Sequence, residues 1–120
     1  MKMNPNAGQS GFTGPLSSSK PLFYPGYVSL TGTCLQTLDA YHLSPFEALA
    51  RHIRGDWGDV SNEVRAQNAR ALAFWDEEGS RICSVYRLSK DVRIWIISEY
   101  EWASVATAIM LPGEAPGLSA

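Results

Sequence analysis

The last third of the chain contains two segments that alternate residue by residue, 81–88 and 92–99, followed by a third apolar segment, 105–111. Alternation with a period of two places successive side chains on opposite faces of a β-strand. The connections at 89–91 and around 100–104 are short, as antiparallel neighbours require. The sequence therefore predicts an antiparallel meander. Trp95, in the middle strand, is expected to pack in the core rather than stack on a nucleic-acid base.

The best-defined helix precedes this region and begins after Ser44. Pro45 suits the first helical position, and Glu47 completes a capping box with the serine. Gly55 ends the helix because glycine tolerates a positive φ. His52 falls on the flank of the apolar face of this helix, while Arg51 points away from it.

Two further helices and a short strand complete the predicted elements. The strand covers 26–32, one helix covers about 33–42 with Thr33 as its cap, and another covers about 61–75. Ser61 or Asp59 would cap the last helix. Asn68 lies on its inward face, where a buried side-chain amide must be hydrogen-bonded.

Helices that precede a meander indicate an α+β fold, with two to three N-terminal helices packed on one face of a three- to four-stranded antiparallel meander. Residues 25–112 should form one domain. Residues 1–24 are rich in Gly, Pro, Ser and Asn and are expected to form a disordered or loosely attached tail. Residues 113–120 are expected to form a flexible C-terminal tail.

Composition narrows the class of protein. The 120 residues carry ten basic and twelve acidic side chains, for a formal charge of −2, which is not the basic surface typical of DNA-binding domains. Neither a signal peptide nor a run of about 18 apolar residues is present, so a cytoplasmic protein without membrane contact is expected. The spacing of Cys34 and Cys83 permits a disulfide, but free thiols are favoured in that compartment. No spacing indicates a metal or cofactor.

The stretch RHIRGDWGDV, residues 51–60, concentrates charged, aromatic and glycine residues in ten positions. Gly55, Gly58 and Asp59 suit a structural corner in which one helix stops and the next is capped. Trp57 could plug this corner. The arginines and the remaining aspartate suit a binding surface, so the candidate binding residues are Arg51, Arg54, Asp56 and Trp57.

A second set of residues suits phosphate chemistry. His52 can transfer protons near neutral pH, Arg81 can clamp a phosphate, Tyr86 can assist proton transfer, and Thr107 can hold an oxygen. These residue types are sufficient for metal-independent RNA cleavage, in which the 2′-hydroxyl is the nucleophile. The alternative assignment is structural, with His52 bonded across a packed corner, Tyr86 in the core and Arg81 on a solvated face.

The stretches PFEALARHIRGDWGDV, NARAL, SRICSVYRL, IWIISE and TAIMLP resemble a family of small bacterial proteins of plasmids, integrative elements and phage-like regions. The resemblance spans about residues 26–112, and its most specific part is the H-x-x-G-D-W-G core, His52–Gly58. This chain departs from the family pattern at Glu101-Trp102, where relatives carry an Asp-Arg pair. The resemblance implies a mobile-element protein without implying a particular activity.

A looser likeness is to the barnase–EndoU–colicin–RelE class of ribonucleases, in which helices precede a small antiparallel sheet. Arg51-His52 on a helix and Thr107 on the last strand carry this likeness at the level of the fold alone. Two functions are therefore expected. One is an accessory protein that binds a protein or nucleic-acid partner, and the alternative is a toxin-like endoribonuclease using His52, Arg81, Tyr86 and Thr107.

Overall fold

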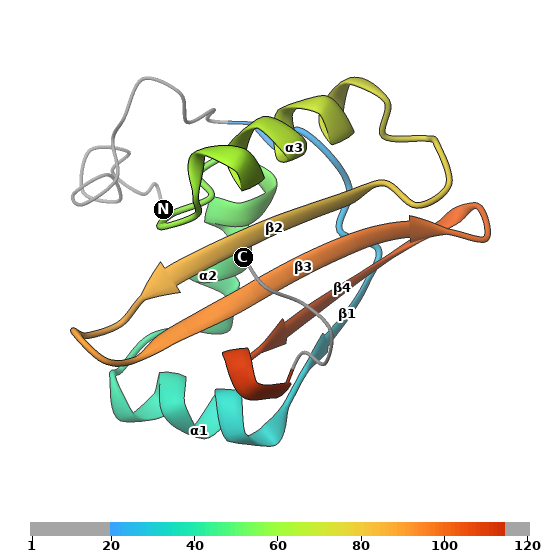
Figure 1. The fold of residues 1–120 in the computed structure, drawn as a ribbon. Helices are drawn as coiled ribbons and strands as arrows, with labels where there is room; N and C mark the ends of the chain where they lie inside the picture. The colour runs from blue at the N-terminus through green and yellow to red at the C-terminus, as the bar shows by residue number, and fades with distance from the viewer. Residues whose placement is uncertain (1–19, 115–120) are drawn as a thin grey trace.

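The computed structural model describes residues 20–114, which form an α+β fold with three helices and a four-stranded sheet (Figure 1). The predicted fold class is confirmed. The elements, in chain order, are β1 Tyr27–Leu30, α1 Gly32–Ala40, α2 Pro45–Ile53, α3 Asn62–Ala73, β2 Arg81–Arg87, β3 Arg93–Glu101, β4 Ser104–Met110 and a short 3₁₀ turn, Pro112–Glu114.

The sheet has the strand order β1-β4-β3-β2. Strands β2, β3 and β4 form the predicted antiparallel meander, with Val85 opposite Trp95 and Ile97 opposite Ala108. Strand β1 adds to β4 in parallel, with Tyr27 opposite Ala106. This parallel pairing was not predicted, because it joins segments that are separated by all three helices and leaves no local pattern in the sequence.

The core lies between the sheet and helices α1 and α2. Cys34 and Leu38 of α1 pack against isoleucines of the meander, among them Ile94, Ile96 and Ile109. Burying an aliphatic side chain of this size contributes about 1.5–3 kcal/mol. Helix α3 instead packs beside β2, with which it makes most of its contacts, and Figure 1 shows it running along that edge of the sheet.

The helix caps follow the sequence closely. The Ser44 hydroxyl accepts a hydrogen bond from the Phe46 amide at 3.1 Å, and the Ser61 hydroxyl accepts one from the Val64 amide at 3.1 Å. The Ser44 cap was predicted, and of the two alternatives for α3, Ser61 or Asp59, the structure has Ser61. Thr33 was wrong as the cap of α1, because the chain turns into the helix directly after β1 and places Thr31 at that position.

The segment before β1 belongs to the folded domain. Phe23 is only 7% exposed, and its ring lies 5.4 Å from the ring of His52 and 5.1 Å from that of Trp75. The Leu22 amide donates to the Ile53 carbonyl at 2.7 Å. Residues 20–24 are therefore anchored, contrary to the expected tail, because one aromatic side chain fills a gap between α2 and α3. The remainder of the predicted tails, 1–19 and 115–120, lies outside the described residues.

Candidate functional site

His52 lies at the centre of a buried chain of hydrogen bonds that crosses the sheet. Its Nδ1 lies 2.6 Å from the Ser84 hydroxyl, and its Nε2 lies 2.8 Å from the Ser98 hydroxyl. Ser98 in turn lies 2.7 Å from the Thr107 hydroxyl, which donates to the Pro25 carbonyl at 2.7 Å. The chain thus connects the segment before β1 with β4, β3, α2 and β2.

The carbonyl at one end fixes the direction of every bond in this chain. A carbonyl only accepts, so the Thr107 proton is committed to Pro25 and Thr107 accepts from Ser98. Ser98, having donated its proton, accepts from Nε2–H of His52. The unprotonated Nδ1 of His52 therefore accepts from the Ser84 hydroxyl. One tautomer of neutral His52 satisfies all of these groups.

Burial holds His52 in this neutral form. The side chain is 0% exposed, and desolvation lowers its pKa from 6.5 to about 3. The contact between the Ser84 hydroxyl and Nδ1 resembles that of an activated nucleophile with its base. Ser84 and Ser98 are also 0% exposed, so a substrate does not reach either hydroxyl in this conformation. The geometry suits a structural role for His52.

The other candidates for RNA cleavage are distributed over the molecule. Thr107 belongs to the His52 chain, while the Tyr86 hydroxyl donates to the Asp56 carbonyl at 2.6 Å, and burial raises the pKa of Tyr86. Arg81 points to the opposite face of β2 from Tyr86 and forms an exposed ion pair with Glu99 at 2.8 Å. Within the described part of the chain, the four candidate side chains therefore do not meet in one open cleft.

The predicted binding residues of the corner mostly hold the corner together. The guanidinium of Arg51 lies 4.4 Å above the centre of the Tyr86 ring, and its Nε donates to the Asp56 carboxylate at 2.7 Å. Trp57 is 8% exposed and packs in the core, and Gly55 has the positive φ expected of a helix stop. Arg54 alone of this set is exposed.

The same corner covers the outer edge of β2. The Val85 amide donates to the Trp57 carbonyl at 3.0 Å, and the Asp59 amide donates to the Val85 carbonyl at 2.7 Å. Gly58 sits between them with φ +73°, where an added Cβ would lie 2.1 Å from the Val85 carbonyl oxygen. Asp59 forms an ion pair with Arg87 at 2.6 Å, and the bond from Arg87 lowers the pKa of Asp59.

Asn68 completes the cover of this edge. Its side-chain amide donates to the Cys83 carbonyl at 2.7 Å, and its side-chain oxygen accepts from the Cys83 amide at 3.0 Å. The side chain thus replaces the two main-chain bonds of a neighbouring strand. Its predicted inward position and hydrogen bonding are confirmed. Trp95 packs on the far face beside Val85, as expected of a structural residue.

The outer edge of β1 has no such cover among the described residues. Strand β1 ends the sheet, and its first three residues are exposed, with Tyr27 at 76% and Val28 at 37%. The segment leading into it adds Tyr24, which is also 76% exposed. This edge carries no charged side chain and no proline between residues 27 and 30, so it lacks the usual devices that discourage strand pairing.

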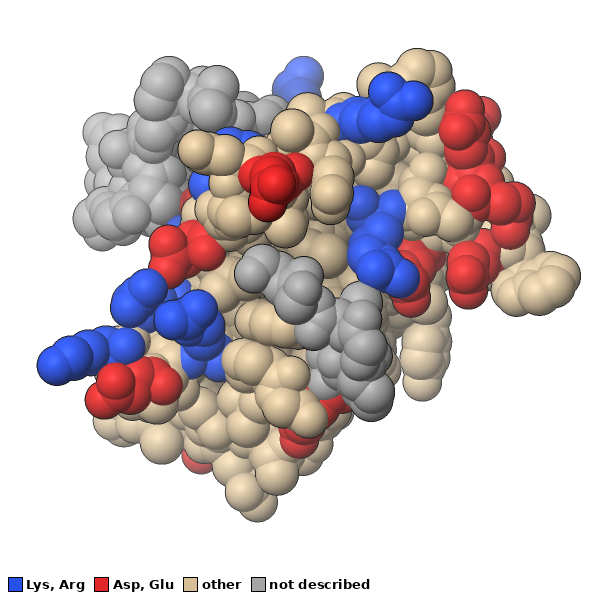
Figure 2. Space-filling view, in the orientation of Figure 1, with Lys and Arg blue, Asp and Glu red and all other residues tan. Residues whose placement is uncertain are grey.

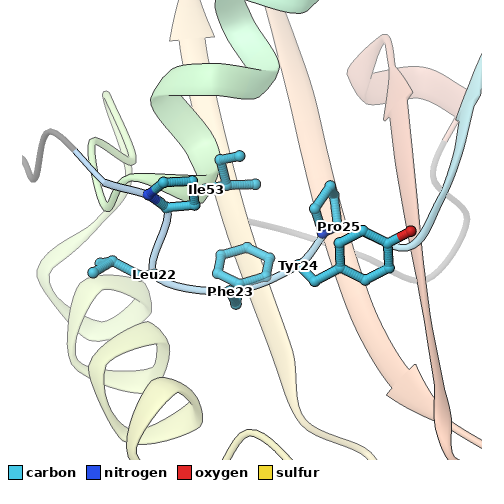
Figure 3. Close-up of a pocket in the computed structure, with 6 residues that line it drawn as sticks. Leu22, Phe23, Tyr24, Pro25 and Ile53 are labelled. Carbon is cyan, nitrogen blue, oxygen red and sulfur yellow. The ribbon is translucent and has the colours of Figure 1, made fainter.

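A shallow apolar pocket lies at the segment that leads into β1, with a volume of about 410 Å³. It is lined by Pro21, Leu22, Phe23, Tyr24, Pro25 and Ile53. In Figure 3 the side chains of Leu22 and Tyr24 point to opposite sides of Phe23. This segment and the start of β1 together form an apolar and largely exposed stretch over residues 21–28, which is here called the β1 surface.

Trp102 is a separate exposed aromatic residue at the turn between β3 and β4. It is 89% exposed, and both it and Ala103 adopt a positive φ. The Glu78 carboxylate accepts from both of their amides, at 2.7 and 3.0 Å. This turn is therefore held by one carboxylate.

Charges on the visible face form separate groups instead of one basic surface (Figure 2). Arg51, Arg81 and Arg87 each form an ion pair with a carboxylate.

Among residues 20–114, the acidic, histidine and cysteine side chains form no group able to hold a metal ion. Cys34 and Cys83 are free thiols. In the same part of the chain, the helices are too short or too polar to cross a membrane.

Comparison with protein-family models, curated proteins and solved structures found no match for this chain. Function must therefore be argued from the geometry. Sequence reasoning missed Ser84 and Ser98, the partners of His52. Their signal was a polar residue at an inward position on each of two otherwise apolar strand faces. It also missed the β1 surface, since an open edge is defined only once the strand order is known.

Proposed function

We propose that this chain is a non-enzymatic interaction protein that binds a protein partner at the β1 surface. The observation that carries the proposal is the contrast between the two edges of the sheet. The edge of β2 is closed by residues 57–59 and by Asn68, whereas the edge of β1 is open and apolar.

An open edge strand is suited to strand addition. Its free amide and carbonyl groups can pair with an extended segment of a partner whatever the sequence of that segment, and nearby pockets then add side-chain selectivity. Here Tyr24 and Tyr27 supply exposed aromatic surface, and the pocket around Phe23 lies at the segment that leads into the strand. Aromatic residues of this kind are frequent among those that dominate binding energy.

A protein partner fits this surface better than a nucleic acid. Binding to nucleic acid depends on unpaired cationic side chains that displace counterions from phosphates. The chain has a formal charge of −2, and the β1 surface contains no arginine or lysine between residues 21 and 28. The further assignment to a mobile-element accessory protein is supported only by the sequence resemblance.

The endoribonuclease alternative has no comparable support. Its histidine is buried between two serines, and its arginine lies on the other face of the sheet. Incubation of RNA with the wild type and with His52→Ala should give equally negligible cleavage. Cleavage by the wild type that disappears in the variant would contradict the interaction proposal and restore the alternative.

The binding proposal can be tested with a library of random extended peptides, selected by display on the full chain. Selected peptides should be rich in β-branched and aromatic residues and should bind at the β1 surface. Binding should fall about tenfold or more in Tyr27→Ala, since truncation of an aromatic anchor commonly costs more than 1 kcal/mol. Titration calorimetry with one synthetic peptide gives the affinities.

Phe74→Ala is the matched control, because Phe74 is also an exposed aromatic residue, at 47%, but lies at the end of α3, beside the opposite edge of the sheet. This variant should bind the peptide as the wild type does. Equal losses in both variants, or no loss in either, would show that the peptides do not recognise the β1 surface.

A further inference from the structure

We infer that the protein partner at β1 is a second copy of this chain, whose β1 pairs antiparallel with the first across a two-fold axis at Ser29. This inference rests on the proposed function and names the partner of the same surface. The result would be one continuous sheet of eight strands, with the closed β2 edge at each end.

The hydrogen-bond pattern of β1 determines which of its groups are free. The Thr31 amide donates to the Ile109 carbonyl at 3.2 Å, so Thr31 directs its main-chain groups toward β4. Main-chain groups alternate in direction along a strand, so those of Tyr27 and Ser29 also point toward β4. The amide and carbonyl of Val28 and of Leu30 consequently point away from the sheet.

One antiparallel register uses all four of these free groups. With Ser29 opposite Ser29 of the partner subunit, Val28 faces the partner's Leu30 and Leu30 faces the partner's Val28. Each of these two pairs is of the hydrogen-bonded kind, which gives four main-chain bonds. Ser29 and Ser29 of the partner subunit then form the non-hydrogen-bonded pair between them, because the two kinds of pair alternate along antiparallel strands.

The side chains are compatible with their own copies in this register. Val28 and Leu30 lie on the face of the sheet that carries Thr107 and Ile109, so two aliphatic pairs form on that face. On the other face, two small serines meet at the axis. Like charges that oppose each other across strands are destabilising, and β1 contains none. Because β1 has no charged side chain, two copies can pair without repulsion between like charges, whereas a charged segment would find no opposite charge on β1.

The register predicts a specific disulfide. Cα atoms in a non-hydrogen-bonded antiparallel pair lie about 4.5 Å apart, which is within the range that a disulfide spans. Ser29→Cys should therefore form a cross-linked dimer in a glutathione redox buffer, seen on non-reducing gels. In Tyr27→Cys the two thiols would be displaced by four residues, about 13 Å along the strands, which is too far for a disulfide.

Because Tyr27→Cys also removes an aromatic side chain of the β1 surface, it is compared with Ser29→Cys in the Tyr27→Ala background, so that the two proteins differ in the position of the thiol, which is exposed and on the same face of the same strand in both. Both variants retain Cys83, so its cross-links should be equal in the two. We expect about tenfold less dimer from Tyr27→Cys than from Ser29→Cys in that background. Equal cross-linking, or none in either variant, overturns the inferred register.

Sedimentation equilibrium on the wild type provides a second measurement. The average mass should rise toward that of a dimer with concentration, and Ser29→Lys, which opposes two charges at the axis, should remain a monomer. A wild type that stays monomeric overturns the inference of a second copy. If the selected peptides still bind through Tyr27 in that case, the proposed function stands with another partner. If they also fail to bind there, both are overturned.

Discussion

The two edges of the sheet differ in whether their outward-facing main-chain groups have hydrogen-bond partners. At β2, the free groups of Cys83 and Val85 are paired with a side-chain amide and with the main chain on either side of a glycine. At β1, the free groups of Val28 and Leu30 meet no described segment. Since an open edge invites association, the difference indicates that the fold is closed on one side and able to extend on the other.

The difference also separates residues that stabilise the fold from residues available for binding. The RHIRGDWGDV stretch looks chemically active, yet most of its members close the β2 edge or support that closure. The segment 21–28 looks unremarkable in sequence, yet it places two aromatic side chains, Tyr24 and Tyr27, each 76% exposed, beside an open edge. Concentrated polar residues can thus mark a structural corner rather than a site.

The largest expected effect comes from Gly58→Ala, which breaks the closed edge. An added Cβ would meet the Val85 carbonyl oxygen at 2.1 Å, so residues 57–59 must move away from β2. We expect a loss of about 4 kcal/mol in the free energy of unfolding, measured by urea denaturation. Gly79→Ala is the control, because Gly79 also has a positive φ, +88°, but open space around it, and it should lose only about 1 kcal/mol. Equal losses would show that backbone strain, rather than contact with β2, explains the effect.

Asn68→Leu should weaken the same edge by about 3 kcal/mol, because the amide and carbonyl of Cys83 would lose their partners in a buried position. The control is Gln67→Leu at the neighbouring exposed position, where the change should be within about 0.5 kcal/mol. The same urea titrations measure both. A loss below 1 kcal/mol in Asn68→Leu would mean that water replaces the amide and that the edge is not sealed.

Lowering the pH should reduce the free energy of unfolding through His52, which lies at the centre of the buried chain of hydrogen bonds. The pKa of His52 is about 3 in the folded protein and 6.5 when unfolded, so the unfolded state takes up the proton first as the pH falls. Stability present above pH 6.5 is then lost at about 1.4 kcal/mol per pH unit, or about 2 kcal/mol by pH 5. Urea titrations at pH 7 and pH 5 measure this. The lowered pKa values of Asp59 and Glu114 act only nearer pH 4, so equal stability at pH 7 and 5 would contradict the assignment of a neutral buried His52.

The smallest effect on folding is expected at the open edge. Val28→Lys should change the free energy of unfolding of the monomer by less than about 0.5 kcal/mol, because its side chain is partly solvated and its main-chain groups bond nothing within the described chain. Val85→Lys, at the buried equivalent on β2, should be strongly destabilising. Comparison of the two in dilute solution sharpens the contrast, and a large loss in Val28→Lys would show that the β1 edge is covered after all.

Local sequence signals predicted much of this fold. Ser44, Pro45 and Gly55 marked the limits of α2, Ser61 marked the start of α3, and the alternation in 81–99 marked two strands of the meander. These signals work because caps and strand faces depend on residues within a few positions of each other. The inward position of Asn68 also followed from helical periodicity alone.

The tertiary structure decided everything that depends on distant partners. His52 has a residue type suited to catalysis, but its environment is set by Ser84 and Ser98, which are 32 and 46 residues away. The parallel pairing of β1 with β4 likewise joins positions 79 residues apart, and it alone determines which edge of the sheet is open. The sequence by itself specified the elements and their faces, because these follow from local geometry. Which polar groups are buried and which edge is free were decided by the packing, because burial and strand order are properties of the whole assembled sheet.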